Sequence, residues 1–214
     1  MELKKGELKS FLEDKVVQYN QYKFIESDPI SIPHQFSNKQ DIEIAGFFAA
    51  TIAWGNRKSI IKNARDLMTR MDHAPYDFIR NHTAADLAVL EGFVHRTFQE
   101  EDVLFFVARL QQLYQDYSSL ETLFIPKENE TDMHASLTRF HETFFAVAHP
   151  RRTEKHISNP AKKSAAKRLH MFLRWMVRQD ASGVDLGIWK NIAPGKLSCP
   201  LDVHSGNVAR RLGL

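Results

Sequence analysis

The sequence is poor in cysteine and has no long apolar run, and each absence excludes a class of protein. Its one cysteine in 214 residues, Cys199, excludes an internal disulfide and an iron–sulfur cluster held by cysteine alone. No apolar run approaches the roughly 20 residues that a membrane span needs, and mixed charge rather than an apolar signal segment follows Met1–Lys5. We therefore expect a soluble, cytoplasmic protein with no membrane partner.

Convincing strand patterns, internal repeats and low-complexity tracts are absent too, and helical periodicity fills the chain. The fold class that this pattern predicts is all-α. We expect one two-lobed helical domain over residues 1–214, with a hinge at about 149–160. Helices are predicted over 3–19, 41–54, 57–71, 75–80, 83–90, 100–117, 131–148, 163–178 and 202–211.

Positive charge is modest in total but concentrated in one stretch. The net charge is only +3, yet residues 151–178 carry nine Lys or Arg residues against a single acid, Glu154. Such a stretch can neutralise phosphates, although a solvated helix face explains it as well. The candidate phosphate contacts within it are Lys162, Arg168, Arg174 and Arg178.

The final residues predict a short helix with a charged start. Pro200 cannot prolong a helix from upstream, Asp202 is a favoured N-cap residue and Gly213 suits the position after the last turn. Val203 and Val208, together with Leu212, predict a buried side for this helix. A carboxylate at a helix N-terminus is held in place and kept ionised.

Other kinds of chemistry find little support in the residue spacing. None of the ten histidines forms the i, i+4 pair with a nearby acid that marks a zinc helix, so we expect no metal and no cofactor. Cys199 has no base near it in sequence, and the chain lacks a glycine-rich phosphate loop. Lysine and aspartate therefore remain as the candidate catalytic groups.

Lys163 and Lys167 open the predicted basic helix, and each has two interpretations. As part of a solvated face they do no chemistry. In a cleft, with basic neighbours and partial burial, either amine could attack an electrophilic sugar carbon. Asp202 likewise has two interpretations, as a structural N-cap or as a catalytic group, because an N-cap carboxylate is also suited to electrostatic stabilisation.

Two stretches resemble a known superfamily. Pro200-Leu201-Asp202-Val203-His204, followed by Val208-Ala209-Arg210-Arg211-Leu212-Gly213-Leu214, resembles the aspartate-bearing motif and following helix of helix-hairpin-helix base-excision DNA glycosylases. The hairpin over 41–69, with Trp54-Gly55-Asn56-Arg57 at its turn, is similar to the region of their Ser-Gln-Gln-Thr-like motif. The whole chain also resembles an uncharacterised bacterial family known only as a domain of unknown function.

The glycosylase resemblance implies a set of roles. Asp202 would be the catalytic aspartate, and Lys167, or else Lys163, the nucleophile of a glycosylase that also cleaves the strand. His204 and Asn207 would join the DNA contacts, since backbone amides of the last helix would hold phosphates. Trp54, Asn56 and Arg57 would line the cleft that receives a flipped base. The resemblance also implies further helices after Leu214.

The leading hypothesis is therefore a DNA-binding, glycosylase-like protein that acts in DNA repair on a flipped, damaged base. The alternative is a noncatalytic α-helical module that binds nucleic acid or a protein through the same basic face. The sequence leaves open whether the chain is an enzyme.

Overall fold

The structure is a computed structural model, and it describes residues 5–214. Its regular structure is helical except for one hairpin of two strands, each two residues long, which confirms the all-α fold class. Within residues 5–214, none of the helices combines the length and the apolar character that crossing a bilayer requires.

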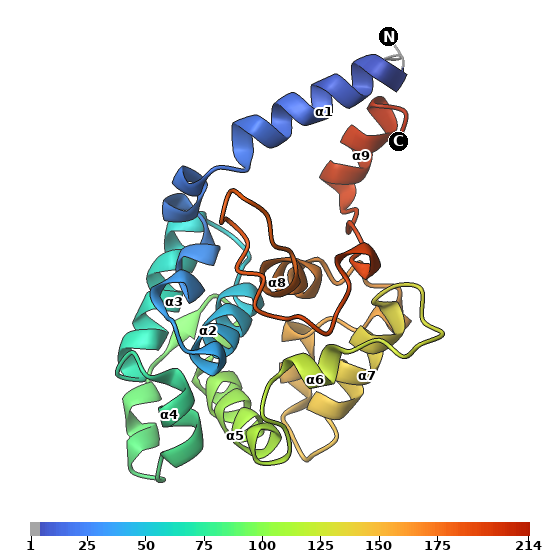
Figure 1. The fold of residues 1–214 in the computed structure, drawn as a ribbon. Helices are drawn as coiled ribbons and strands as arrows, with labels where there is room; N and C mark the ends of the chain where they lie inside the picture. The colour runs from blue at the N-terminus through green and yellow to red at the C-terminus, as the bar shows by residue number, and fades with distance from the viewer. Residues whose placement is uncertain (1–4) are drawn as a thin grey trace.

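Nine α-helices in the described range follow one another along the chain (Figure 1). They are α1 (Lys5–Tyr19), α2 (Lys39–Thr51), α3 (Arg57–Arg70), α4 (Pro75–Asn81), α5 (Glu100–Asp116), α6 (Glu121–Phe124), α7 (His134–Phe144), α8 (Lys167–Val177) and α9 (Val203–Arg211). Short 3-10 turns connect them: η1 (Tyr22–Ser27), η2 (Pro29–Ser31), η3 (Pro33–Gln35), η4 (Asp86–Leu90), η5 (Arg151–His156), η6 (Pro160–Lys162) and η7 (Pro194–Lys196). The hairpin is β1 (Val94–His95) paired with β2 (Phe98–Gln99).

Helix α2 lies at the centre of the core. The Asn38 side chain caps it by accepting from the backbone N–H groups of Gln40 and Asp41. Every residue from Ile42 to Thr51 is buried, as expected for a helix with neighbours on all sides. On one side it contacts α8, where Gly46 lets the helices approach so closely that a Cβ atom would lie 2.6 Å from Cε of Met176. Helices α2 and α8 therefore pack directly against each other.

A buried carboxyl group connects α2 to three other parts of the chain. Glu43, with 0% of its surface exposed, accepts hydrogen bonds from the Tyr114 hydroxyl (2.9 Å), the Ser119 hydroxyl (2.5 Å), the Leu120 N–H (3.0 Å) and the Trp189 indole N–H (2.7 Å). These four donors satisfy a group that would otherwise be costly to bury. Burial, together with the nearby Glu43, raises the pKa of Tyr114, so its hydroxyl stays protonated and able to donate.

Helix α8 begins at Lys167 rather than at Lys163. Lys163 and Ala166 both have left-handed backbone conformations, with φ of 61° and 44°, and this conformation interrupts a right-handed helix. Elsewhere, the predicted helix over 83–90 contains only the 3-10 turn η4, and the short helix α6 was not predicted.

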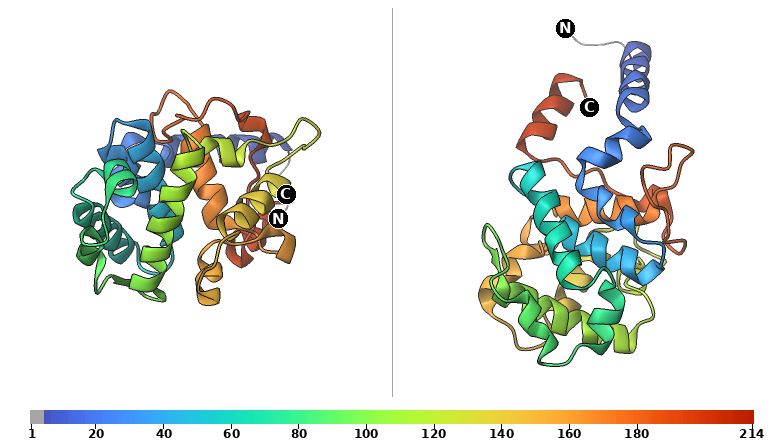
Figure 2. Two further views of the ribbon diagram at one scale, coloured as in Figure 1. Left: turned by 90° about the horizontal axis from the view of Figure 1, so that it is seen from below. Right: turned by 90° about the vertical axis from the view of Figure 1, so that its left-hand side faces the viewer.

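The first and last helices, α1 and α9, extend from the same end of the body (Figures 1 and 2). No residue of α1 is buried, and Gly206 is the one buried residue of α9. Val203 and Val208 are 75% and 56% exposed. The predicted buried side of the last helix is therefore wrong, because this helix has almost no contact with the core.

We expect Glu43→Ala to lower the free energy of unfolding by about 3–5 kcal/mol, because four buried donors lose their acceptor. Urea unfolding followed by circular dichroism measures the change. The control is Glu13→Ala on α1, whose side chain is 66% exposed and whose loss should change stability by less than about 0.5 kcal/mol. Equal midpoints for the two variants would contradict a central role for Glu43.

Candidate functional site

Lys167 and Asp202 meet in the folded chain although 35 positions separate them in sequence, with Nζ of Lys167 2.5 Å from Oδ2 of Asp202. Lys167 is the first residue of α8, and Asp202 is the N-cap of α9. The N-terminal ends of the two helices therefore come together at this pair. Because a helix dipole favours negative charge at that end, the place suits an anion.

Local sequence holds the Asp202 carboxylate in position. The Ser205 N–H donates to Oδ1 at 2.8 Å, and the Ser205 hydroxyl accepts from the Asp202 N–H at 2.9 Å. This reciprocal arrangement is a capping box, and it confirms the predicted N-cap. At the far end, Gly213 takes φ of 75° as the residue after the cap, as predicted.

The hydrogen bond from Lys167, followed by those from Ser205, holds the pKa of Asp202 far below its usual range. Asp202 is therefore ionised at any physiological pH. The pair lies at the surface, with side chains 58% and 34% exposed for Lys167 and Asp202. Lys163 is exposed at the end of η6 and takes part in no ion pair within the described residues. Of the two candidate lysines, the structure thus brings Lys167 to Asp202.

Of the four predicted phosphate contacts in the 151–178 stretch, three form ion pairs with acidic residues of the protein. Arg174 and Arg178 both donate to the buried carboxylate of Asp185, at 3.1 and 2.9 Å. Lys162 lies 3.6 Å from Glu154. The positive charge of the 151–178 stretch is thus partly neutralised by acids, and all of these except Glu154 lie outside that stretch. His204 and Asn207 are exposed on α9, and Asn207 accepts from Arg210 at 3.1 Å.

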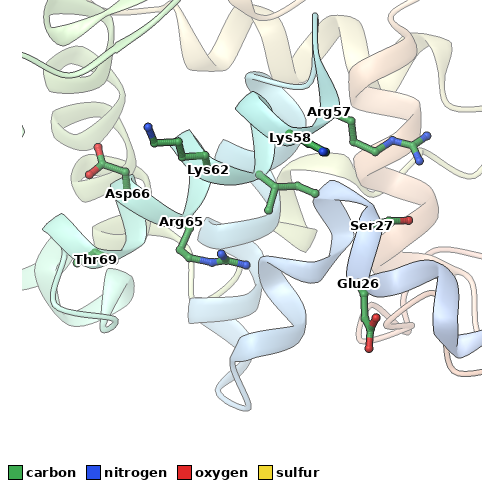
Figure 3. Close-up of a pocket in the computed structure, with 9 residues that line it drawn as sticks. Glu26, Ser27, Arg57, Lys58, Lys62, Arg65, Asp66 and Thr69 are labelled. Carbon is green, nitrogen blue, oxygen red and sulfur yellow. The ribbon is translucent and has the colours of Figure 1, made fainter.

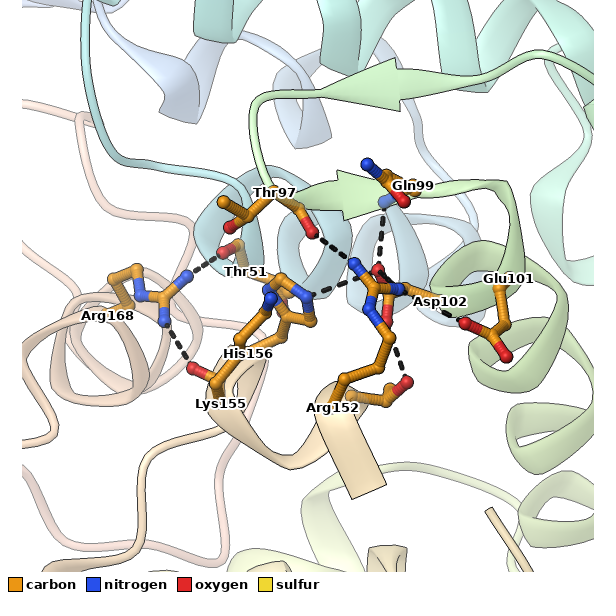
Figure 4. A network of polar contacts seen from close by, with 10 residues as sticks. Thr51, Thr97, Gln99, Glu101, Asp102, Arg152, Lys155, His156 and Arg168 are labelled. Carbon is orange, nitrogen blue, oxygen red and sulfur yellow. Dashed lines mark hydrogen bonds and ion pairs between the residues drawn. The ribbon is translucent and has the colours of Figure 1, made fainter. Parts of the chain in front are cut away.

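Arg168 is enclosed rather than presented to solvent. Its guanidinium donates to the backbone carbonyls of Thr51 and Lys155 (Figure 4) and lies 4.8 Å from the ring centre of Trp54, within cation–π range. Burial lowers the pKa of Arg168 to about 10, so it remains a cation at neutral pH. These contacts leave Arg168 poorly placed to bind a phosphate.

The two other residues expected to line a cleft have different surroundings. Asn56 caps α3 by accepting from the N–H groups of Lys58 and Ser59. Arg57 is exposed and lies 6.0 Å from the ring centre of Phe24. Neither residue contacts the Lys167–Asp202 pair, so the structure does not bring the predicted cleft residues to the predicted catalytic residues.

A buried polar cluster around Asp102 and His156 was not indicated by the sequence (Figure 4), and the ring of His156 stacks on that of Trp54 with the ring centres 5.7 Å apart. Asp102 accepts from the Thr153 hydroxyl at 2.6 Å and from Arg152 at 2.7 Å, and His156 Nε2 lies 3.3 Å from its Oδ2. Burial by itself raises the pKa of Asp102, but the hydrogen bond from Thr153 and the others, with the nearby cations, lower it on balance. Burial lowers the pKa of His156 to about 4, although Asp102 opposes this shift.

A basic groove on α3 was also missed (Figure 3). It has a volume of about 870 Å³ and lies between α3 and η1, lined by Glu26, Ser27, Arg57, Lys58, Ile61, Lys62, Arg65, Asp66 and Thr69. The spacing of Lys58, Lys62 and Arg65, at i, i+4 and i+7, could have indicated one helical stripe of positive charge.

Comparison with protein families matches residues 28–214 to the family described as "Protein of unknown function (DUF2400)". This confirms the resemblance of the whole chain to an uncharacterised family. A search of curated proteins found no match. A search of solved structures found none either.

The buried histidine His156 gives a prediction for pH. Its pKa of about 4 lies below the value of about 6.5 for an unfolded histidine, so the unfolded chain binds more protons between these two values. Stability contributed by His156 is therefore complete above about pH 6.5 and declines as the pH falls towards 4. We expect the His156 ring resonances in an NMR titration to move with a midpoint near pH 4. A midpoint close to 6.5 would show that the ring is solvated.

Proposed function

Because the chain belongs to the DUF2400 family of proteins of unknown function, we propose its activity from its own residues: it binds DNA and removes a damaged base as a glycosylase-type enzyme. Lys167 is the proposed nucleophile, and Asp202 the group that stabilises a cationic sugar. The observation that carries the proposal is the 2.5 Å contact between these two side chains, which the glycosylase resemblance had singled out separately.

The proposed step needs a nucleophile and a fixed negative charge at one place. Nζ of Lys167, once it has lost a proton, forms a bond to C1′ of the sugar, and the bond from C1′ to the base breaks with its electron pair leaving on the base. The base takes up a proton. Positive charge develops on the sugar during this change, and a carboxylate that stays ionised stabilises it. The low pKa of Asp202 fits this role better than the role of a general base.

One observation favours the noncatalytic alternative, a helical module that binds nucleic acid or a protein. The Lys167–Asp202 contact also connects α9, with its single buried residue, to α8 of the body. An ion pair that only positions α9 would have the same geometry. The two functions differ in what happens to DNA once it is bound.

A borohydride-trapping assay over a panel of damaged duplexes separates them. After attack by Lys167, the C1′–O4′ bond breaks with its electron pair going to O4′, and O4′ takes up a proton from Nζ. The protonated imine that forms between Nζ and C1′ is reduced by borohydride to a stable covalent adduct. We expect the native chain to form this adduct with at least one lesion and Lys167→Gln to form none. Lys163→Gln is the matched control and should keep the adduct. Trapping by Lys167→Gln at the native level would rule Lys167 out as the nucleophile.

Asp202→Asn tests the carboxylate separately. Asparagine caps a helix about as well as aspartate, so we expect little change in melting temperature. The negative charge is lost, and we expect base release to fall by roughly 100-fold or more, as for other groups that stabilise transition-state charge. Base release at the native rate would show that Asp202 serves only as a cap and as the partner of Lys167.

A further inference from the structure

The α3 groove carries positive charge that the protein itself does not neutralise. Lys58, Lys62 and Arg65 are exposed, and none of them takes part in an ion pair within residues 5–214. Of the two acids in the groove, Asp66 is already paired with Arg70 at 2.9 Å. This differs from the basic stretch on α8, where Arg174 and Arg178 share Asp185.

The three cations form a line along one helix face. Positions 58, 62 and 65 follow the i, i+4, i+7 spacing, so they lie on the same side of α3. Like charges one turn apart repel, and none of these three residues forms an ion pair within the described protein. In Figure 3 the charged ends of Lys58 and Arg65 lie on the side of α3 that faces Ser27 of η1, whereas the charged end of Lys62 points away from Ser27.

The lining favours an extended anion over a compact ligand. Small-molecule sites are lined mainly by apolar side chains, whereas Ile61 is the one apolar residue among those that line this groove. The line from position 58 to 65 spans roughly 10 Å of helix. Duplex DNA carries one negative charge per roughly 1.7 Å of its axis, so the same length presents about six phosphates.

We propose that the α3 groove is a binding surface for the phosphate backbone of DNA. This inference rests on the proposed function for the identity of the polyanion, and it locates the main backbone contact on α3 rather than on the 162–178 stretch. Such contacts are independent of sequence and position the DNA without reading it.

The test compares two triple variants that each remove three positive charges. The groove variant is Lys58→Gln, Lys62→Gln and Arg65→Gln, and the matched control is Lys5→Gln, Lys9→Gln and Lys15→Gln on α1, where no residue is buried. Binding to a labelled, undamaged duplex is measured by fluorescence anisotropy between about 50 and 200 mM salt. We expect the groove variant to bind more weakly and its salt slope to fall by about one for each residue replaced. The control should bind as the native chain does.

Other results would contradict the groove inference, the proposed function or both. Native-level binding by the groove variant overturns the groove inference and leaves the proposed function standing. A native chain that binds no duplex at the lowest salt overturns both. A loss confined to one DNA sequence contradicts a backbone contact. If the triple variant melts early, the single variants Lys58→Gln and Arg65→Gln replace it, each with an expected fall of about one in the salt slope, and unchanged slopes for both overturn the inference.

Discussion

The buried carboxyl group of Glu43 is the interaction on which the rest of the fold depends. It lies on α2, and its four donors come from α5, from the segment before α6 and from the loop that follows α8. A carboxyl group with no exposed surface is tolerable only when its acceptors are satisfied, so these segments must arrive in one arrangement. With α2 fixed in this way, Gly46 brings α8 into direct contact, and α8 carries Lys167 at its first residue.

The proposed site therefore depends on the core, which positions α8, and on the surface ion pair between Lys167 and Asp202. Lys167 is positioned by a helix that packs on α2, and Asp202 by a capping box of its own. The ion pair between them connects α8 to α9, a helix with one buried residue. Such an exposed ion pair contributes little to stability. Its role would therefore be either in catalysis or in positioning α9.

The number of Lys and Arg residues in a segment of this protein differs from the number that remain without an ion pair. In the 151–178 stretch, which has the greatest excess of Lys and Arg, Arg174 and Arg178 both form ion pairs with Asp185. Arg168 of the same stretch packs against the ring of Trp54. Helix α3 has fewer basic residues but leaves Lys58, Lys62 and Arg65 without ion pairs in the described chain. A polyanion responds to unneutralised charge at the surface, and on α3 three such residues follow one another along a single helix.

The sequence by itself determined the helices, because their periodicity, caps and breakers act within a few residues: the Asp202 cap, the Gly213 stop and most helix limits follow from local geometry. It also indicated Asp202 and two lysines, Lys163 and Lys167, as candidate groups, and the resemblance then implied their roles. Tertiary structure alone decided that Lys167 rather than Lys163 reaches Asp202, that α2 packs closely against α8 at Gly46, and that Val203 and Val208 stay exposed. These outcomes depend on which surfaces meet and on which side chains pair across long separations in sequence, such as Glu43 with the indole N–H of Trp189 and Asp202 with Lys167. Local patterns carry no information on such pairings.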